Sequence, residues 1–240
     1  MSSPKLVYLA LALTVALSLQ PTSYGAEPLL HRCAGSSNYT STSFNLQRVL
    51  LSLNIKTAAT GFSMSSAGKN SDRVSGLSLC RGAVSGSDCR TCVKDASIAI
   101  QQRCPNQKQG IIWYDNCMLR YSDLQFFGKI DSENRFFICN TQNVSNPEVF
   151  NKREGELMSA LSRGASTSPL YYAVGVIESG EGSNIYGLAE CTRDLSSADC
   201  KTCLDNAIAS LPSFCGGKKG GRSVSGSCSL RYEIYPFFKQ

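Results

Sequence analysis

The 240-residue chain contains a single histidine, His31, and charged residues make up only 18% of it. The scarcity of histidine excludes most histidine-dependent catalysis and most zinc sites with mixed histidine and cysteine ligands. The formal net charge is +6, and the densest basic cluster is Lys218, Lys219 and Arg222 among glycines. This weak charge pattern argues against a nucleic-acid partner. No run of about 18 apolar residues occurs, so we expect no membrane span.

Cysteine, in contrast, is abundant, with twelve residues. A large, even number of cysteines is typical of proteins that fold in an oxidising compartment. The N-terminus fits that compartment, because Lys5 precedes an apolar run over residues 6–19 that is followed by small residues. We therefore predict a secreted, extracellular protein with a signal peptide over residues 1–25, cleaved after Gly25 or, alternatively, after Ala26.

The cysteines occur in two sets of six, and from the second cysteine onward the intervals are 9, 3, 12 and 13 residues in both sets. Other residues repeat in the same register, including Arg120 with Arg231. The chain is therefore a tandem of two homologous domains, which we place at residues 26–128 and 134–240. Because the intervening segment is short, we expect the two domains to pack in a fixed arrangement.

Each repeat combines helical and strand-like patterns. Apolar residues spaced by three and four predict a first helix in each repeat, and Asn146 is suited to cap the second of these. A further helix is expected to start near Asp88 in the first repeat and near Asp199 in the second. Strand-like segments cover residues 74–80, 111–121, 171–177, 185–191 and 223–235. Each repeat is therefore expected to be an α+β domain with two helices packed on an antiparallel sheet.

Each repeat also contains a Cys-x-x-Cys motif, Cys89 to Cys92 and Cys200 to Cys203. Such a motif is compatible with a redox pair, a zinc site or structural disulfides. We favour structural disulfides and no metal, because the protein is predicted to be secreted and its cysteines are even in number.

Six cysteines allow fifteen pairings, and the expected elements favour one of them. A cysteine at the start of a helix can bond to the cysteine that ends the preceding strand. The cysteine one turn later can bond to the cysteine of the following strand, which leaves the first and fifth cysteines as partners. In the first repeat these pairs are Cys33–Cys104, Cys80–Cys89 and Cys92–Cys117.

The doubled Cys-x8-Cys-x2-Cys pattern resembles the plant cysteine-rich repeat secretory proteins, whose repeat is the ginkbilobin-homologous, stress-antifungal domain. The resemblance implies two tandem α+β domains, each with two helices packed on a five-stranded antiparallel sheet and stapled by disulfides. It implies the same disulfide order in both repeats, which in the second gives Cys139–Cys215, Cys191–Cys200 and Cys203–Cys228. Without a kinase or a membrane span, the chain resembles the branch secreted to the apoplast.

The resemblance also implies a sugar site. Ginkbilobin binds mannose through an Asn after the first cysteine, an Arg six residues before the last and a Glu five residues after it. In the second repeat these positions hold Asn140, Arg222 and Glu233, whereas the first repeat holds Ala34, Ile111 and Ser122. A carboxylate, a guanidinium and an amide supply the acceptors and donors that sugar hydroxyl groups need, so no metal or cofactor is required. A purely structural alternative pairs Arg222 with Glu233 at the surface and makes Asn140 a turn residue.

We therefore predict a mannose-binding, lectin-like plant defence protein with an antifungal or stress function, whose partners are mannose or mannan-type glycans. The alternative is an apoplastic protein-interaction or signalling module without sugar binding, in which Trp113, Tyr114 and the pair Tyr232 and Tyr235 would contact a protein partner. An enzyme is disfavoured, because no nucleophile motif occurs and no spacing selects a pair of acids. Asn38 and Asn143 begin tripeptides that accept N-linked glycans in a secreted protein.

Overall fold

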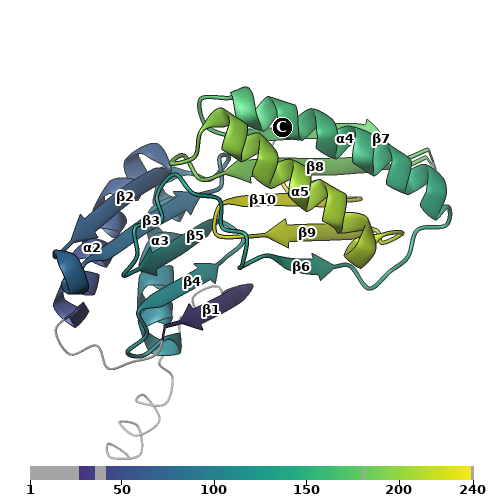
Figure 1. Cartoon of the computed structure of the whole chain (residues 1–240). Coiled ribbons are helices and arrows are strands. Elements are labelled where there is room, and N and C mark those ends of the chain that lie inside the picture. Colours follow the sequence, from purple (N-terminus) through teal and green to yellow (C-terminus); the bar gives the residue numbers. More distant parts are fainter. Residues whose placement is uncertain (1–26, 36–41, 181, 239–240) are drawn as a thin grey trace, which may run out of the picture.

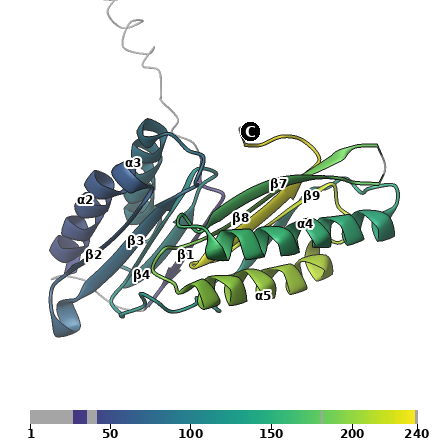
Figure 2. The same ribbon diagram turned by 90° about the horizontal axis from the view of Figure 1, so that it is seen from above.

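The computed structural model describes residues 27–35, 42–180 and 182–238 (Figure 1). The predicted signal peptide and Asn38 lie outside the described residues. The chain forms two five-stranded antiparallel sheets, and two helices cover one face of each sheet (Figure 2). The predicted fold class is therefore confirmed.

The two repeats have the same order of strands and α-helices and the same sheet topology. The first repeat contains β1 (Leu30–Ala34), α2 (Thr42–Thr60), β2 (Phe62–Ala67), a short 3-10 helix (Asn70–Asp72), β3 (Val74–Cys80), α3 (Gly86–Arg103), β4 (Gln109–Trp113) and β5 (Cys117–Ser122), with sheet order β1-β4-β5-β3-β2. The second contains β6 (Phe136–Cys139), α4 (Pro147–Thr167), β7 (Tyr172–Glu178), β8 (Asn184–Cys191), α5 (Ser197–Cys215), β9 (Gly220–Val224) and β10 (Cys228–Glu233), with sheet order β6-β9-β10-β8-β7.

Local sequence accounts for where the helices begin. The side chain of Asn146 accepts a hydrogen bond from the Val149 N–H at 3.3 Å, which caps α4 as predicted. Ser85 and Ser196 cap α3 and α5 in the same way, at 3.1 Å each. The strands predicted from the sequence were less complete. Residues 111–121 and 223–235, each predicted as one strand-like segment, form two strands joined by a tight turn.

All twelve cysteines are in six disulfides, and these are the pairs named above for both repeats. Each cysteine of a Cys-x-x-Cys motif is bonded to a partner outside the motif. The motifs therefore hold no thiol that could act in redox chemistry or bind zinc.

The two repeats pack directly on each other through an apolar cluster. This cluster combines side chains of the first sheet with Val224 of β9 and Phe136 of β6. Trp113 of β4 belongs to this cluster and is 3% exposed. Its indole Nε1 donates a hydrogen bond to the Ser225 carbonyl at 2.9 Å. The ring of Trp113 also meets the edge of Phe136. The tandem is thus held together by a small core of its own.

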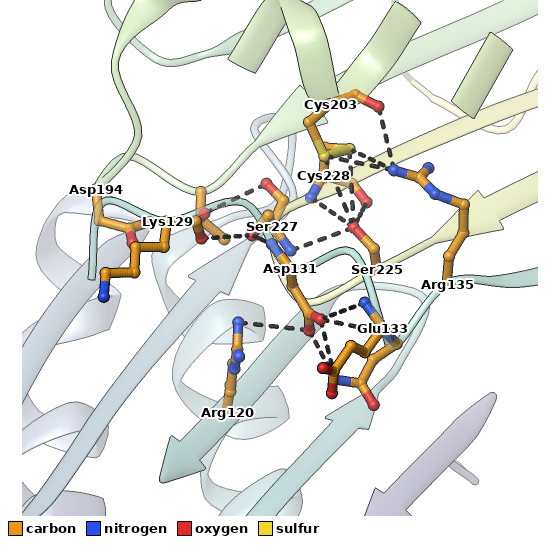
Figure 3. Close-up of polar contacts among 12 residues, drawn as sticks. Arg120, Lys129, Asp131, Glu133, Arg135, Asp194, Cys203, Ser225, Ser227 and Cys228 are labelled. Atoms are coloured by element: carbon orange, nitrogen blue, oxygen red, sulfur yellow. Dashed lines mark hydrogen bonds and ion pairs between the residues drawn. A yellow bond between two sulfur atoms is a disulfide. The ribbon is translucent and has the colours of Figure 1, made fainter. Parts of the chain in front are cut away.

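The segment that joins the repeats is bonded on both sides (Figure 3). Asp131 is 6% exposed and forms an ion pair with Arg120 of β5, with 3.4 Å between Nη1 and Oδ2. Its backbone N–H donates to the hydroxyl of Ser227 in the second repeat at 2.8 Å. The Gly128 N–H donates to Asp194 Oδ2 at 2.9 Å. The connection therefore belongs to the interface rather than acting as a flexible linker.

Candidate functional site

Strand register brings the three predicted sugar-site residues together. Gly220 of β9 pairs with Glu233 of β10, and its carbonyl accepts a hydrogen bond from the Asn140 N–H at 2.8 Å. Arg222 lies two residues beyond Gly220, so its side chain projects from the same face of the sheet. A side chain added at the intervening Gly221 would instead contact Cys215 of α5. The candidate residues therefore share the face of the second sheet that carries no helices.

Glu233 is held by an arginine and retains one carboxylate oxygen for other partners. Its Oε1 accepts from Arg231 Nε at 3.0 Å and from Arg231 Nη2 at 2.9 Å. Its Oε2 lies over Gly220, where an added Cβ would be 2.0 Å away. Among the described residues Oε2 has no hydrogen-bond partner. The absence of a side chain at Gly220 thus leaves the space that the Glu233 carboxylate occupies.

The two polar side-chain atoms of Asn140 have different roles. Its Oδ1 accepts a hydrogen bond from the Gln142 N–H at 2.9 Å, as the turn-residue alternative requires. Its Nδ2 has no partner in the described part of the chain and remains available as a donor. Asn140 is therefore oriented by the turn without losing its capacity to donate.

Arg222 is paired with a residue of the first repeat. Its Nη2 donates to Oδ1 of Asp115, in the turn between β4 and β5, at 2.6 Å. The same oxygen lies 3.6 Å from Arg231 Nη1. The Arg222 side chain is 12% exposed, whereas that of Asp115 is 60% exposed. Arg222 and Glu233 therefore do not pair with each other, which contradicts the surface-pair alternative stated above.

The local charges favour the ionised form of Asp115. Desolvation opposes the charged carboxylate, but the hydrogen bond and positive charge of Arg222, followed by the charges of Arg231 and Arg81, outweigh it and lower the pKa of Asp115. Desolvation and the neighbouring Arg231 lower the pKa of Arg222, which still remains a cation at neutral pH. The site thus contains a fixed cluster of opposite charges.

Beneath this cluster lies a cavity of about 50 Å³, lined by residues of both repeats. Its walls include Trp113, Arg222 and Glu190 of β8. A volume of this size holds a few water molecules and excludes a hexose, so a sugar would bind on the sheet surface above it. Glu190 Oε2 is buried there without a hydrogen-bond partner, and burial raises the pKa of its carboxyl to about 7.

The equivalent surface of the first repeat is used differently. Ile111 and Ser122 are 4% and 3% exposed, and Ala34 supplies no polar side-chain atom. The arginine equivalent to Arg231 is Arg120, which pairs with Asp131 of the connecting segment. At the three equivalent positions this surface therefore lacks the amide, guanidinium and carboxylate of its counterpart.

The structure corrects part of the surface named for a protein-binding role, because Tyr232 is also buried, whereas Tyr235 is 47% exposed. Trp113 and Tyr114 are 3% and 8% exposed, because the second repeat covers Trp113 and the first core encloses Tyr114. They cannot contact a partner protein in this fold. Asn143 is exposed, and its Oδ1 accepts from Lys218 Nζ at 2.7 Å; its glycosylation stays a prediction.

Sequence reasoning missed three residues of this site, which are Asp115, Gly220 and Arg231. The sequence shows that Arg231 repeats Arg120, but it does not indicate that Arg231 binds Glu233. The contact of Asp115 with Arg222 joins residues 107 positions apart, and no local pattern signals it.

Within the described residues, no group of three or more histidine, cysteine, aspartate or glutamate side chains could hold a metal ion. Nor does any helix in this part of the chain combine the length and apolar character needed to cross a membrane.

A family model described as salt stress response/antifungal matches residues 32–124 and 138–235. The chain is 50% identical over 228 residues to an antimicrobial ginkbilobin-2-like protein of Castanea crenata, covering 94% of each chain. It is 48% identical over 216 residues to cysteine-rich repeat secretory protein 38 of Arabidopsis thaliana, covering 88% of this chain and 86% of that protein.

A solved structure has the same fold. The tandem DUF26 ectodomain of the Arabidopsis thaliana cysteine-rich receptor-like protein PDLP8 superposes with a TM-score of 0.78 at 26% sequence identity. The match covers 87% of this chain and 98% of that chain, so the tandem arrangement as well as the single repeat is shared.

Proposed function

Because the chain belongs to the salt stress response/antifungal family, with cysteine-rich repeat secretory proteins among its relatives, we propose that it is a secreted, lectin-like plant defence protein. It binds mannose or mannan-type glycans through Asn140, Arg222 and Glu233 of the second repeat. The observation that carries this proposal is their position on one helix-free surface, formed by β9, β10 and the residue that follows β6. The antimicrobial name of the relative from Castanea crenata supports the defensive role.

The unpaired groups of this surface match the chemistry of a sugar. A hexose presents neighbouring hydroxyl groups, each of which donates and accepts hydrogen bonds. Glu233 Oε2 offers an acceptor, Asn140 Nδ2 a donor, and Arg222 the N–H groups that Asp115 does not use. Bonds to the two charged groups are stronger than bonds between neutral ones.

Asp115 also prepares Arg222 for this task. A long arginine side chain loses rotamer freedom when a ligand immobilises it, and that loss weakens binding. The 2.6 Å bond to Asp115 restrains Arg222 before the ligand arrives. Binding at a single shallow site of this kind is nevertheless weak, because each new hydrogen bond replaces one to water.

Titration calorimetry of the mature protein with mannose tests the proposal. Arg222→Ala is expected to lose about 1.5–3 kcal/mol of binding free energy, the range for a hydrogen bond to a charged group. Glu233→Ala and Asn140→Ala are expected to weaken binding as well. Ser122→Ala changes the position equivalent to Glu233 in the first repeat and is expected to leave mannose binding unchanged.

Two results would overturn the lectin proposal. One is a parent protein that does not bind mannose in calorimetry or in sugar-observed NMR. The other is an Arg222→Ala variant that binds mannose as well as the parent while circular dichroism shows an intact fold.

A second candidate function is an apoplastic protein-interaction module. It is favoured by three apolar side chains of α2, Phe44, Leu51 and Ile55, which are 65%, 60% and 68% exposed. A relative at 38% identity is named cysteine-rich receptor-like protein kinase 25, of which the match covers 33%. Retention on a mannan column and elution with free mannose would favour the lectin; failure to be retained would favour the interaction module.

A further inference from the structure

A groove of about 640 Å³ lies between the two repeats, beside the candidate sugar site. One wall is the loop from β3 to α3 in the first repeat, together with Asn116 of the turn between β4 and β5. The other wall is the C-terminal segment of the second repeat, including Phe237 and Phe238. This segment runs along the side of the second sheet away from α4 and α5 (Figure 2). Volumes of about 300–1,000 Å³ are typical of small-molecule sites.

Neighbouring residues link the groove to the candidate site. Asp115, which binds Arg222, is followed in the chain by Asn116 of the groove. Arg231, which binds Glu233, places its guanidinium 4.2 Å from the centre of the Phe237 ring. A ligand seated on Arg222 and Glu233 can therefore extend into the groove without leaving the protein surface.

The groove offers both apolar faces and polar groups. The rings of Phe237 and Phe238 meet edge to face, with 5.0 Å between their centres. The ring of Phe238 also packs on Tyr186 of β8, with 6.2 Å between the ring centres. These contacts restrain both phenylalanine rings. Arg81 donates to Asn116 Oδ1 at 3.3 Å, but its buried Nε has no hydrogen-bond partner. Aromatic faces suit the C–H side of a sugar ring, while amide and guanidinium groups suit its hydroxyls.

We propose that this groove is a second carbohydrate subsite and that the two subsites together bind one linear oligosaccharide rather than a single hexose. The proposal rests on the proposed function, because the first subsite is the mannose site of the second repeat. The first repeat, which lacks the three residue types of the mannose site, contributes Arg81 and Asn116 to the second subsite.

The experiment compares mannose with a linear mannotetraose in calorimetric titrations of the mature protein. The tetrasaccharide is expected to bind at least about tenfold more tightly than mannose, since each tenfold corresponds to about 1.4 kcal/mol from added contacts. Asn116→Ala and Phe238→Ala are expected to remove most of that gain and to leave the affinity for mannose unchanged. Among the described residues, no hydrogen bond, ion pair or ring contact joins Asn116 or Phe238 to Asn140, Arg222 or Glu233.

Phe214→Ala is the matched control, because Phe214 is 60% exposed but stacks on Phe137 on the helix side of the second repeat. It is expected to bind both sugars as the parent does. Equal affinities of the parent for mannose and mannotetraose would overturn the second subsite and leave the proposed function standing. If the parent bound neither sugar, the proposed function and this inference would both fail. Tetrasaccharide binding that Asn116→Ala weakens and Arg222→Ala does not would support the groove and refute the first subsite.

Discussion

The two repeats share one scaffold but differ at a pair of facing positions. In the first repeat Gln109 pairs with Ser122, and in the second Gly220 pairs with Glu233. The longer side chain is thus on the first strand of the pair in the first repeat, at Gln109, and on the second strand in the second repeat, at Glu233. The exchange creates room in the second repeat for the Glu233 carboxylate, which covers Gly220 of β9.

The two repeats also use an equivalent arginine in different ways. Arg120 and Arg231 each lie 4.2 Å from the ring of a following phenylalanine. Arg120 pairs with the buried Asp131 of the connecting segment, whereas Arg231, whose side chain is equally buried, pairs with Glu233 and with the exposed Asp115. A duplicated position can therefore serve the interface in one copy and hold a candidate binding residue in the other.

Removing the acidic partner of each arginine should separate these roles. Asp131→Ala is expected to cost about 3 kcal/mol of unfolding free energy, because Arg120 is left largely buried without its counter-charge. Glu233→Ala is expected to cost about 1 kcal/mol, because Arg231 keeps Asp115 and the hydroxyl of Tyr235. Denaturant unfolding with the disulfides intact measures both values, and equal losses would contradict the distinction.

The pH dependence of stability should also originate in the second repeat. Glu154 of α4 is 7% exposed, Oε1 has no hydrogen-bond partner, and burial raises the pKa of its carboxyl from 4.5 to about 7. The folded chain then holds this proton more tightly than the unfolded chain. The resulting stabilisation is complete below about pH 4.5 and is lost as the pH rises to about 7, a change of up to about 3 kcal/mol. Glu190 adds a change of the same sign, and its equivalent in the first repeat is Leu79.

Melting temperatures between pH 4 and 8 test this prediction. Glu154→Gln should be more stable than the parent at pH 8 and should lose less stability between the two extremes. Glu156→Gln is the matched control on the same helix, because Glu156 is 44% exposed and pairs with Arg153. A parent whose stability increases steadily from pH 4 to pH 7 would refute the assignment.

The smallest expected effect concerns the exchange of side-chain size. A methyl group at position 220 would be 2.0 Å from Glu233 Oε2, so Gly220→Ala must displace that carboxylate. Because the carboxylate is the end of a flexible side chain, we expect a change in stability below about 1 kcal/mol. Mannose affinity should nevertheless fall several-fold, about 1 kcal/mol. Unchanged affinity in calorimetry would show that the position of Glu233 over Gly220 has no part in binding.

Much of the architecture could be predicted from residue spacing. The repeated cysteine intervals indicated the tandem, and the helical periodicity and caps indicated the helices. The resemblance carried by the same cysteines supplied the five strands and the three candidate residues. The edge strands β1, β2 and β6 were not recognised, because short strands that are partly exposed lack a long apolar or alternating pattern.

The cysteine spacing specifies the scaffold because each disulfide joins elements that are close in every copy of the repeat. It says nothing of how the two copies meet. The burial of Trp113 and Ile111, the pairing of Asp115 with Arg222 and the groove beside Phe237 all depend on contacts between residues about 100 or more positions apart. Such contacts arise when two folded surfaces pack together, so the face that is covered and the face that stays open become apparent only in the assembled tandem.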